Sequence, residues 1–473
     1  MLEIQQVYDI FETVLKKTEN KLRSNDYLEL RYHNKTTMSL LMKNNILEES
    51  YFDEYCGVGI RVLCSGAWGF IPTSIIEKTH ILNTIYKAKK IADYLSTKLK
   101  EKVYLAPIKP IRGRFSAPIK IDPHSIPLEE KIEILSECNK IMKDNDAEIK
   151  SCTSFYNEPH DLKVIQTSEG TCVEIKESKP DFFTSVYAKS STGEMINHTE
   201  SIGTLGGFEF IKEMNDPYKM AEKTNKIARE ILNAPRAPSG SQIVIMDPTM
   251  VGIITHEAIG HLAEADYVLS GSALKDKMGK IITNELISIV DSGKELGSGW
   301  LPIDDEGVET KEVTIINEGM LENYLHTRST AAHFKTEPSG NARAWEYDDP
   351  PLTRMRNTYV KTSHKVNWKR NEIIEDTRNG VLLAGDGEGS ADSTSEFMFT
   401  ALNPYLIKNG EISTILKPCT ISGVAFDVLK LVDAIANDNW MLKMGNGSCG
   451  KIQPIKVDGG GPTIRISNIL IST

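Results

Sequence analysis

Two histidines and a glutamate lie close together near the middle of the chain, at His256, Glu257 and His261. Neutral imidazoles bind divalent transition metals well, and a carboxylate beside one of them can act as a base towards water on that metal. The spacing is H-E-x-x-x-H, one residue longer than the H-E-x-x-H pattern whose histidines share one helix face. The residue types therefore indicate metal-dependent hydrolysis, and the spacing sets a geometric condition on it.

The extra residue changes the directions in which the two imidazoles point. Each residue of a regular α-helix turns by about 100°, so side chains at i and i+5 diverge by about 140°, too far to hold one ion. A local i→i+5 hydrogen bond, as in a π-bulge, would close this gap, and such bulges are frequent at functional sites. Gly260, directly before His261, is where a helix could deform or another element approach closely. The alternative is a buried helix with a chance histidine pair, and the spacing alone leaves both open.

A catalytic zinc site usually has three protein ligands and one open position. Glu264 and Asp266 lie about one turn beyond the second histidine, although acids in such positions are more often exposed or capping residues. His326 and His333 lie in another segment and are more typical of solvated or hydrogen-bonded histidines. None of these four residues is selected as the third ligand by its position.

Cys449 stands apart from the other six cysteines, which lie in ordinary apolar or strand contexts. Glycines at 445, 447 and 450 surround it and would let its backbone approach another element closely. Composition does not select it as a ligand, so the residues by themselves leave the third ligand open.

The composition is that of a globular protein, with 40% hydrophobic and 25% charged residues. A length of 473 residues suggests two or three domains. No run approaches the roughly 18 apolar residues of a membrane span, and residues 1–6 lack the features of a secretion signal. We therefore expect no membrane partner.

Cysteine usage and net charge indicate the cellular compartment and whether the protein binds nucleic acid. Seven scattered cysteines, an odd number, argue against a disulfide framework and for a reducing cytoplasm. A net charge of -10 disfavours general nucleic-acid binding. We therefore expect a cytoplasmic protein without a nucleic-acid partner.

Apolar periodicity predicts helices over residues 5–20, 75–99, 128–144, 216–232 and 427–437. Strand patterns occupy residues 26–41, 58–63, 67–71, 281–290, 313–316, 359–362, 380–384 and 405–416, and residues 148–189 alternate as strands with turns at 157–159 and 169–170. The proline-rich segment 234–240 is the best linker candidate.

These elements predict an α+β fold, in which an N-terminal mixed α/β region precedes a β-rich C-terminal domain carrying the metal-binding helix. We expect an N-terminal α/β domain at residues 1–125, a middle α/β region at 126–235 and a β-rich catalytic domain at 236–473.

Six segments in a fixed order carry a family resemblance. They are residues 27–31, residues 57–62 with 66–70, the H-E-A-x-G-H-x-x-E-x-D core at 256–266, Asp-Asp-Glu-Gly at 304–307, residues 350–359 and G-x-C-G-K at 447–451. With these segments the chain resembles the TldD/PmbA family over nearly its whole length. It is similar to the TldD side, because PmbA (TldE) partners lack the H-E-x-x-x-H motif.

The resemblance implies a zinc metallopeptidase of the cytoplasm with His256, His261 and Cys449 as ligands and Glu257 as general base. It also implies short or unfolded peptide substrates and a two-subunit assembly around a shared cavity. That assembly would be a homodimer or a heterodimer with a PmbA/TldE-type paralogue. The sequence thus predicts a zinc-dependent peptidase that cleaves peptides inside a dimer cavity.

Two departures and two rival functions accompany this prediction. The family's Glu-Gly-Asp is Glu-Ala-Asp at 264–266, and its Asp-Pro-Thr-Ser is Asp-Ser-Thr-Ser at 392–395, a change that could alter the substrate groove. The alternative function is a non-catalytic peptide-binding or scaffold subunit, against which the intact His-Glu-His triplet argues. A DNA-directed regulator, suggested by the family's gyrase-modulator label, is disfavoured by the acidic charge.

Overall fold

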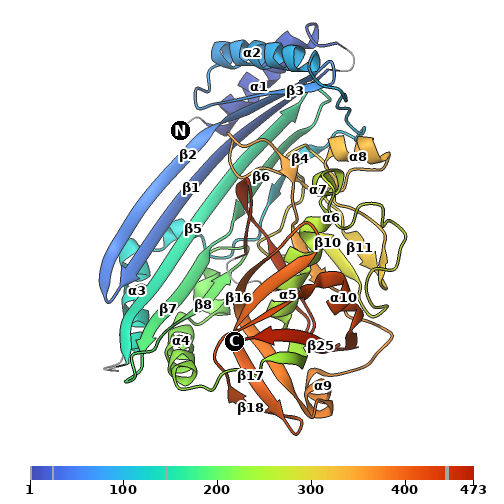
Figure 1. The fold of residues 1–473 in the computed structure, drawn as a ribbon. Helices are drawn as coiled ribbons and strands as arrows, with labels where there is room; N and C mark the ends of the chain where they lie inside the picture. The colour runs from blue at the N-terminus through green and yellow to red at the C-terminus, as the bar shows by residue number, and fades with distance from the viewer. Residues whose placement is uncertain (1–2, 24–25, 144–147, 443–446) are drawn as a thin grey trace.

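The computed structural model describes residues 3–23, 26–143, 148–442 and 447–473, without the side chains of Asp386 and Glu388. A long, curved sheet formed by the N-terminal half stands beside a C-terminal half built from shorter strands and helices (Figure 1). The predicted α+β class is confirmed. None of the helices in the described ranges has the length and apolar character needed to cross a bilayer.

Eight strands form the N-terminal sheet. They are β1 (Tyr27–Lys43), β2 (Ile46–Cys64), β3 (Ala67–Thr73), β4 (Arg112–Ser116), β5 (Ile149–Thr167), β6 (Cys172–Ser178), β7 (Asp181–Lys189) and β8 (Met195–Gly203). The strand order begins β3-β2-β1-β5. The other edge of β5 pairs with β7 along the first half of β5 and with β6 along the second half. β8 then pairs with β7, and β4 pairs with β6. All pairs are antiparallel except β4 with β6.

Four long helices cover this sheet at its two ends: α1 (Ile4–Glu19), α2 (Lys78–Ser96), α3 (Leu128–Lys143) and α4 (Pro217–Leu232). Val7, Phe11 and Val14 of α1 are buried at helical spacing, and they pack in one core with α2 and the first half of β1. A second core joins α3 and α4 to the other half of β1 through Leu40 and Met42. The long strands therefore connect two separate cores.

Two strand predictions in this half need correction. The predicted turn at residues 157–159 lies inside β5, and Pro159 falls where the partner of β5 changes from β7 to β6. A proline is tolerated there because its missing N–H interrupts no continuous ladder. Strand β2 begins at Ile46, well before the predicted start at residue 58, because its first half pairs with β1 despite its polar, exposed sequence.

In the C-terminal half, five strands close into a ring in the order β16-β9-β25-β19-β17 and back to β16. Their bounds are β9 (Gly240–Met246), β16 (Asn379–Ala391), β17 (Glu396–Lys408), β19 (Cys419–Val424) and β25 (Ile464–Ser472), with β18 (Glu411–Ile415) and β20 (Val432–Ile435) attached outside. Closure leaves few free strand edges within this part.

A six-stranded sheet lies beside the ring in the order β12-β11-β10-β15-β24-β21. Its members are β10 (Ile289–Ser292), β11 (Val313–Asn317), β12 (Met320–Leu321), β15 (Asn357–Val360), β21 (Met441–Leu442) and β24 (Asp458–Gly461). This half also contains two separate two-stranded sheets, β13 (Ala342–Arg343) with β14 (Leu352–Thr353) and β22 (Ser448–Lys451) with β23 (Gln453–Lys456). Its remaining helices include α8 (Arg328–Phe334), α9 (Arg370–Asp376) and α10 (Ala425–Lys430).

Three predictions for this half were wrong in extent. The helix expected at 427–437 is α10, which ends at Lys430, and β20 follows because it pairs with β25. The strand expected at 281–290 is only β10, with a single bridge at Ile281. The strand expected at 405–416 is the β17–β18 hairpin, turned at residues 409–410, where both residues have positive φ.

One helix is buried between the ring and the six-stranded sheet. Every residue of α5 (Pro248–Thr255) is buried, and the helix packs against β24, β16 and β15 (Figure 1). Asp247 caps its start by accepting from the N–H of Met250, and Pro248 occupies the first turn. A Cβ on Gly252 would lie 2.7 Å from the backbone of β24, so a glycine is required for this close packing.

Candidate metal centre

The helix that carries the histidine motif widens between its two histidines. α5 continues into η3 (His256–Gly260), which is π-helical, and then into the short helices α6 (His261–Ala263) and α7 (Ala265–Leu269). The N–H of His261 donates to the carbonyl of His256, which is the i→i+5 bond that the spacing requires. The predicted π-type irregularity is confirmed.

Gly260 is needed at this point for packing. A Cβ there would lie only 1.9 Å from the sulfur of Met355. Two reasons for a glycine here were considered from the sequence, a deformed helix and the close approach of another element. The contact with Met355 shows that the second reason applies.

His256, His261 and Cys449 converge in space. One ligand atom from each lies within 4.8 Å of the others, and no other group of three histidine, cysteine or acidic side chains meets that condition in the described residues. The Cys449 Sγ lies 3.1 Å from His261 Nε2, and the two imidazole rings are 5.1 Å apart at an angle of 81°. Gly445, one of the glycines expected to bring Cys449 close, lies outside the described residues, whereas Gly447 has a positive φ of 56°.

His256 is the most informative member of this group. Its side chain is completely buried, and neither Nδ1 nor Nε2 has a hydrogen-bond partner. A buried polar group without a partner loses its hydration without compensation, which is why such groups are rare and need an explanation. A metal ion would satisfy a nitrogen of His256, and two imidazoles with a thiolate are a donor set typical of zinc. The residues present therefore fit the ion.

The thiol and the second imidazole influence each other electrostatically. Burial alone would raise the pKa of Cys449, but the adjacent imidazoles of His256 and His261 outweigh it and lower that pKa to about 4. Burial alone would lower the pKa of His261, but Glu264 and Cys449 together hold it well above its usual value. Cys449 is therefore placed as a thiolate, the form that binds metals.

Glu264 lies directly behind this group, and its burial contradicts the expectation of an exposed or capping acid. Its side chain is fully buried and lies 3.2 Å from Nδ1 of His261. The ammonium of Lys451 donates to Glu264 at 2.8 Å and to the partly exposed Asp266. Burial raises the pKa of Glu264, but His261 and Lys451 outweigh it and lower the pKa.

Lys451 lies on the same hairpin as Cys449, so these contacts tie that hairpin to the histidine helix. Arg354 adds a second connection, donating to the carbonyls of Cys449 and Gln453 at 2.8 Å each. Sequence reasoning gave neither basic residue a role. Both lie in segments that carried the family resemblance, and that was the only signal available.

Glu257 lies at the open side of the group. Its side chain is 30% exposed, and its carboxylate lies 3.9 Å from His261 Nε2 without belonging to the three converging side chains. A partly solvated carboxylate next to such a group can accept a proton from water.

The other two histidine candidates lie elsewhere. His326 is buried beside Thr330, and burial lowers its pKa to about 4, whereas His333 is exposed. Neither belongs to the converging group.

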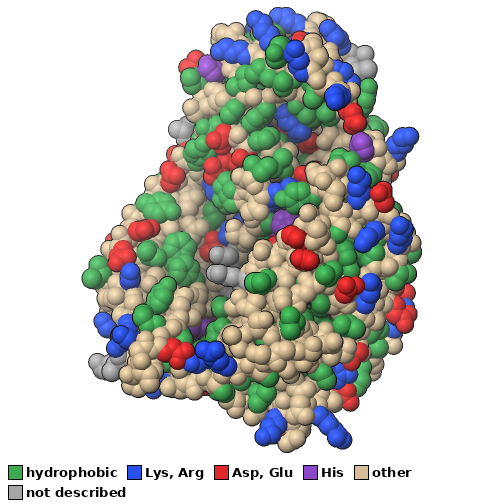
Figure 2. Space-filling model, in the orientation of Figure 1, with side chains coloured by type: hydrophobic (Ala, Val, Ile, Leu, Met, Phe, Trp, Pro, Cys, Tyr) green, Lys and Arg blue, Asp and Glu red, His purple; other side chains and the backbone are tan. Residues whose placement is uncertain are grey.

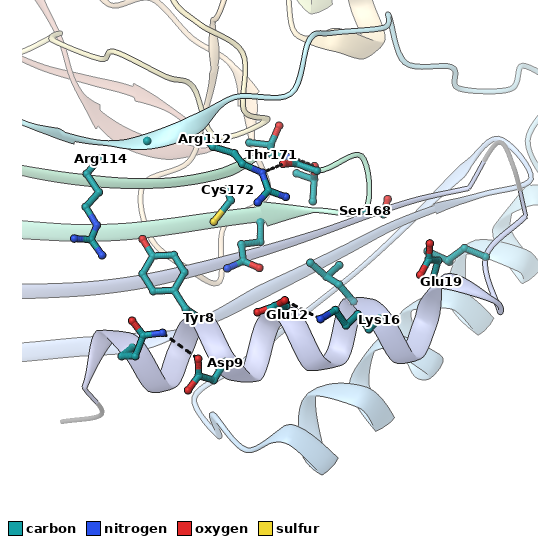
Figure 3. A pocket seen from close by; sticks show the side chains of 17 residues that line it. Tyr8, Asp9, Glu12, Lys16, Glu19, Arg112, Arg114, Ser168, Thr171 and Cys172 are labelled. Carbon is teal, nitrogen blue, oxygen red and sulfur yellow. Dashed lines mark hydrogen bonds and ion pairs between the residues drawn. The ribbon is translucent and has the colours of Figure 1, made fainter.

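A separate cavity of about 730 Å³ lies between α1 and strands β4 and β6 (Figure 3). Its wall includes Tyr8, Glu12, Arg112 and Cys172. None of the candidate metal or catalytic residues lines it, so it is a different part of the molecule.

Three family models match consecutive parts of the chain. They describe domain 1 of the PmbA/TldA metallopeptidases at residues 28–92, the central domain at residues 121–232 and the C-terminal domain at residues 239–473.

Curated relatives match over most of their length. The chain is 34% identical over 455 residues to a metalloprotease of Methanocaldococcus jannaschii, a match covering 95% of this chain and 98% of that protein. It is 31% identical over 427 residues to a zinc metalloprotease TldD homolog of Saccharolobus solfataricus, covering 88% and 89% of the two chains.

Solved structures share the fold. A protein from Thermotoga maritima described as a modulator of a DNA gyrase aligns with a TM-score of 0.79 at 20% identity, over 98% of this chain and 100% of that one. TldE from Thermococcus kodakarensis aligns with a TM-score of 0.75 at 16% identity, again over 98% and 100%.

Proposed function

The chain belongs to the PmbA/TldD family of metallopeptidases, and from this premise we propose that it hydrolyses short or unfolded peptides at a bound zinc ion. His256, His261 and Cys449 hold the ion in this proposal, and Glu257 is the general base. The names of the relatives, a metalloprotease and a zinc metalloprotease TldD homolog, favour a hydrolase of peptide bonds over the non-catalytic subunit considered from sequence.

The observation that carries the proposal is the buried His256, whose two ring nitrogens lack partners while the Cys449 sulfur and the second imidazole lie close by. A structural histidine in a core would be hydrogen-bonded. The name of the Saccharolobus solfataricus relative supports zinc as the ion.

The chemistry divides between the ion and the side chains. A bound zinc ion would supply a Lewis acid that polarises the scissile carbonyl and makes water more acidic. Glu257 takes a proton from the attacking water and delivers it to the leaving amine. Glu264 accepts the Nδ1–H of His261, which fixes the imidazole tautomer and leaves Nε2 directed towards Cys449.

Strand β16 offers a way to hold a peptide. Beyond Leu383 it pairs with β17 alone, no described strand is hydrogen-bonded to its other edge, and it contacts η3 and β8. An extended peptide could add to that edge through main-chain hydrogen bonds, which read the backbone more than the side chains. The residues that depart from the family pattern, 392–395, form the turn after β16, so we propose that they influence the groove.

We also propose a cytoplasmic two-subunit assembly around a shared cavity, either a homodimer or a heterodimer with a TldE-type paralogue. The shared fold with TldE supports a partnership of this kind. We propose domain boundaries near residues 125 and 235, with the histidine helix in the last domain.

The experiment is a paired measurement of zinc content and peptide hydrolysis on the purified chain, together with any co-purifying partner. About one zinc per chain is expected, a chelator should abolish hydrolysis, and added zinc should restore it. A stable protein domain offered as substrate should be cleaved when it is denatured and should resist cleavage when it is folded. Equal cutting of both forms would contradict the enclosed site, and full activity without metal would contradict the zinc mechanism.

A further inference from the structure

The hairpin of β1 and β2 leaves one long edge of the N-terminal sheet uncovered. β3 pairs with β2 only from Val58 to Cys64, so residues 46–57 of β2 pair with β1 on one side and with no described strand on the other. In Figure 1 residues 46–54 of this edge run along the outer side of the sheet, away from the C-terminal half, whereas Tyr55 contacts that half by donating to Asp348 and stacking on Tyr347.

The side chains on this edge combine large apolar groups with acids. Residues 46–54 are all exposed, among them Ile46 (66%), Tyr51 (49%) and Phe52 (60%). The charged residues of this segment are Glu48, Glu49, Asp53 and Glu54, and it contains no lysine or arginine. Figure 2 shows hydrophobic and acidic side chains together along this rim, over β1 and β2.

A free edge of this kind is unusual for a protein that stays alone. Edge strands are normally protected by lysine, proline, bulges or short length, because an unprotected edge pairs with other chains. Residues 46–57 contain no lysine or proline, and the one irregularity in the β1–β2 register is a bulge at Glu48, near the hairpin turn, beyond which residues 49–54 pair regularly with β1. The edge is therefore open to an added strand.

The edge is also held in place before any partner arrives. Leu40 and Met42 of β1, which pair opposite the exposed residues, are buried in the core beneath α3 and α4, and β1 pairs with β5 on its other side. Docking would therefore require little ordering of β2, which reduces the entropic cost of association.

The charge pattern discriminates between possible partners. Antiparallel self-pairing of two copies about Tyr51 would place Glu48 opposite Glu54 and Glu49 opposite Asp53. Registers centred on Ser50 or Phe52 avoid directly opposite acids, but they still place the carboxylates of both copies in one ladder with no lysine or arginine from this segment. Like charges placed directly opposite each other destabilise a sheet. A second copy of this chain therefore fits the edge poorly, whereas a strand carrying lysine or arginine fits it well.

We propose that residues 46–54 of β2 dock an edge strand of a different protein subunit, one whose strand is basic and carries apolar side chains for Tyr51 and Phe52. This inference deepens the two-subunit assembly proposed above, because it names the surface and selects a heteromeric partner. It does not depend on zinc or on peptide hydrolysis.

The test uses the chain itself as its complementary partner. A basic-edge variant carries Glu48→Lys, Glu49→Lys and Asp53→Lys, and it keeps Glu54, which accepts from Asn34. Sedimentation and hydrogen exchange are measured on each chain alone and on their equimolar mixture. The mixture should associate at least about 10-fold more tightly than either chain alone, with residues 46–54 protected, and salt should weaken this association.

A control variant applies the same charge change at exposed acids elsewhere, through Glu309→Lys, Glu375→Lys and Glu411→Lys. Mixing it with the original chain should leave exchange at residues 46–54 unchanged. Absence of protection in the basic-edge mixture would overturn the docking edge. Protection of these residues in the original chain alone, lost on dilution, would show that a second copy is the occupant and would overturn the heteromeric partner. Neither result depends on peptidase activity, so each is distinct from a failure of the proposed function.

Discussion

Two polar clusters of the C-terminal half each contain a fully buried side chain, and they differ in whether the polar atoms of that side chain have partners. Asp291 and Arg356 form an ion pair at 2.7 Å with neither side chain exposed. The carboxylate of Asp291 also accepts from the N–H of Arg356, the hydroxyl of Thr358 and the amide of Asn341. In the other cluster, His256 is equally buried, yet neither of its ring nitrogens has a partner.

This difference separates a structural cluster from a candidate site. A buried charge whose hydrogen bonds are all made positions the backbone around it, and removing one partner mainly affects folding. A buried donor or acceptor without a partner is a cost that a bound ligand can offset. The comparison predicts that variants of the first cluster change stability, whereas variants of the second change metal binding and turnover.

The largest effect is expected from Cys449→Ala. This variant removes one of the three proposed ligands, and zinc content should fall from about one per chain to nearly none, with loss of peptide hydrolysis. The fold should persist, because the hairpin remains held by Arg354 and Lys451. Metal analysis and circular dichroism on the same sample would check this. A variant that keeps its zinc would show that the third ligand lies elsewhere.

Glu257→Gln separates catalysis from metal binding. The carboxylate is not among the three converging side chains, so zinc content should stay near one per chain. Turnover should fall by roughly 10² to 10⁴, the usual contribution of a positioned general base. Near-normal turnover would place the base elsewhere, and loss of zinc would make Glu257 a ligand.

Asp291→Ala tests the structural cluster. It leaves the guanidinium of Arg356 buried without its carboxylate, which should destabilise the fold by about 3–5 kcal/mol. The protein that remains folded should still bind zinc, because Asp291 contacts none of the ligand side chains. Urea unfolding followed with metal analysis would measure both quantities. A selective loss of zinc with unchanged stability would remove the distinction between the two clusters.

The sequence predicted what depends on near neighbours. Helices α3 and α4 were expected at residues 128–144 and 216–232 and lie within one residue of those bounds, because amphipathic periodicity is a local property. The π-helical turn also followed from spacing, since its hydrogen bond joins two residues of one motif.

Features that depend on distant pairing were not predictable in the same way. β20 was expected as helix because its pairing with β25 is not visible in its own residues. The third ligand was left open by the residues, and only the family resemblance indicated Cys449. The contact between Lys451 and Glu264 joins residues 187 positions apart, so its partners could be identified only in the folded chain.

The smallest effect is expected at Glu264, which connects the two kinds of cluster because it is buried and paired yet contacts a proposed ligand. Glu264→Gln keeps the shape and an acceptor for His261 but removes the charge that orients the imidazole. Residues behind metal ligands typically contribute 10- to 100-fold in affinity, so zinc affinity measured against a chromophoric chelator should fall by about that factor.

Asp266→Asn is the matched control for this prediction. It also removes one negative charge beside Lys451, but Asp266 makes no described contact with His261, so zinc affinity should change much less. If Glu264→Gln binds zinc as tightly as the original chain while its unfolding midpoint falls, Glu264 only stabilises the packing of the hairpin against the helix, and its role is structural like that of Asp291. If both variants lower the zinc affinity equally, that affinity depends on the net charge near Lys451 and does not depend on the orientation of His261. A loss confined to Glu264→Gln would show that the carboxylate acts through the imidazole it contacts.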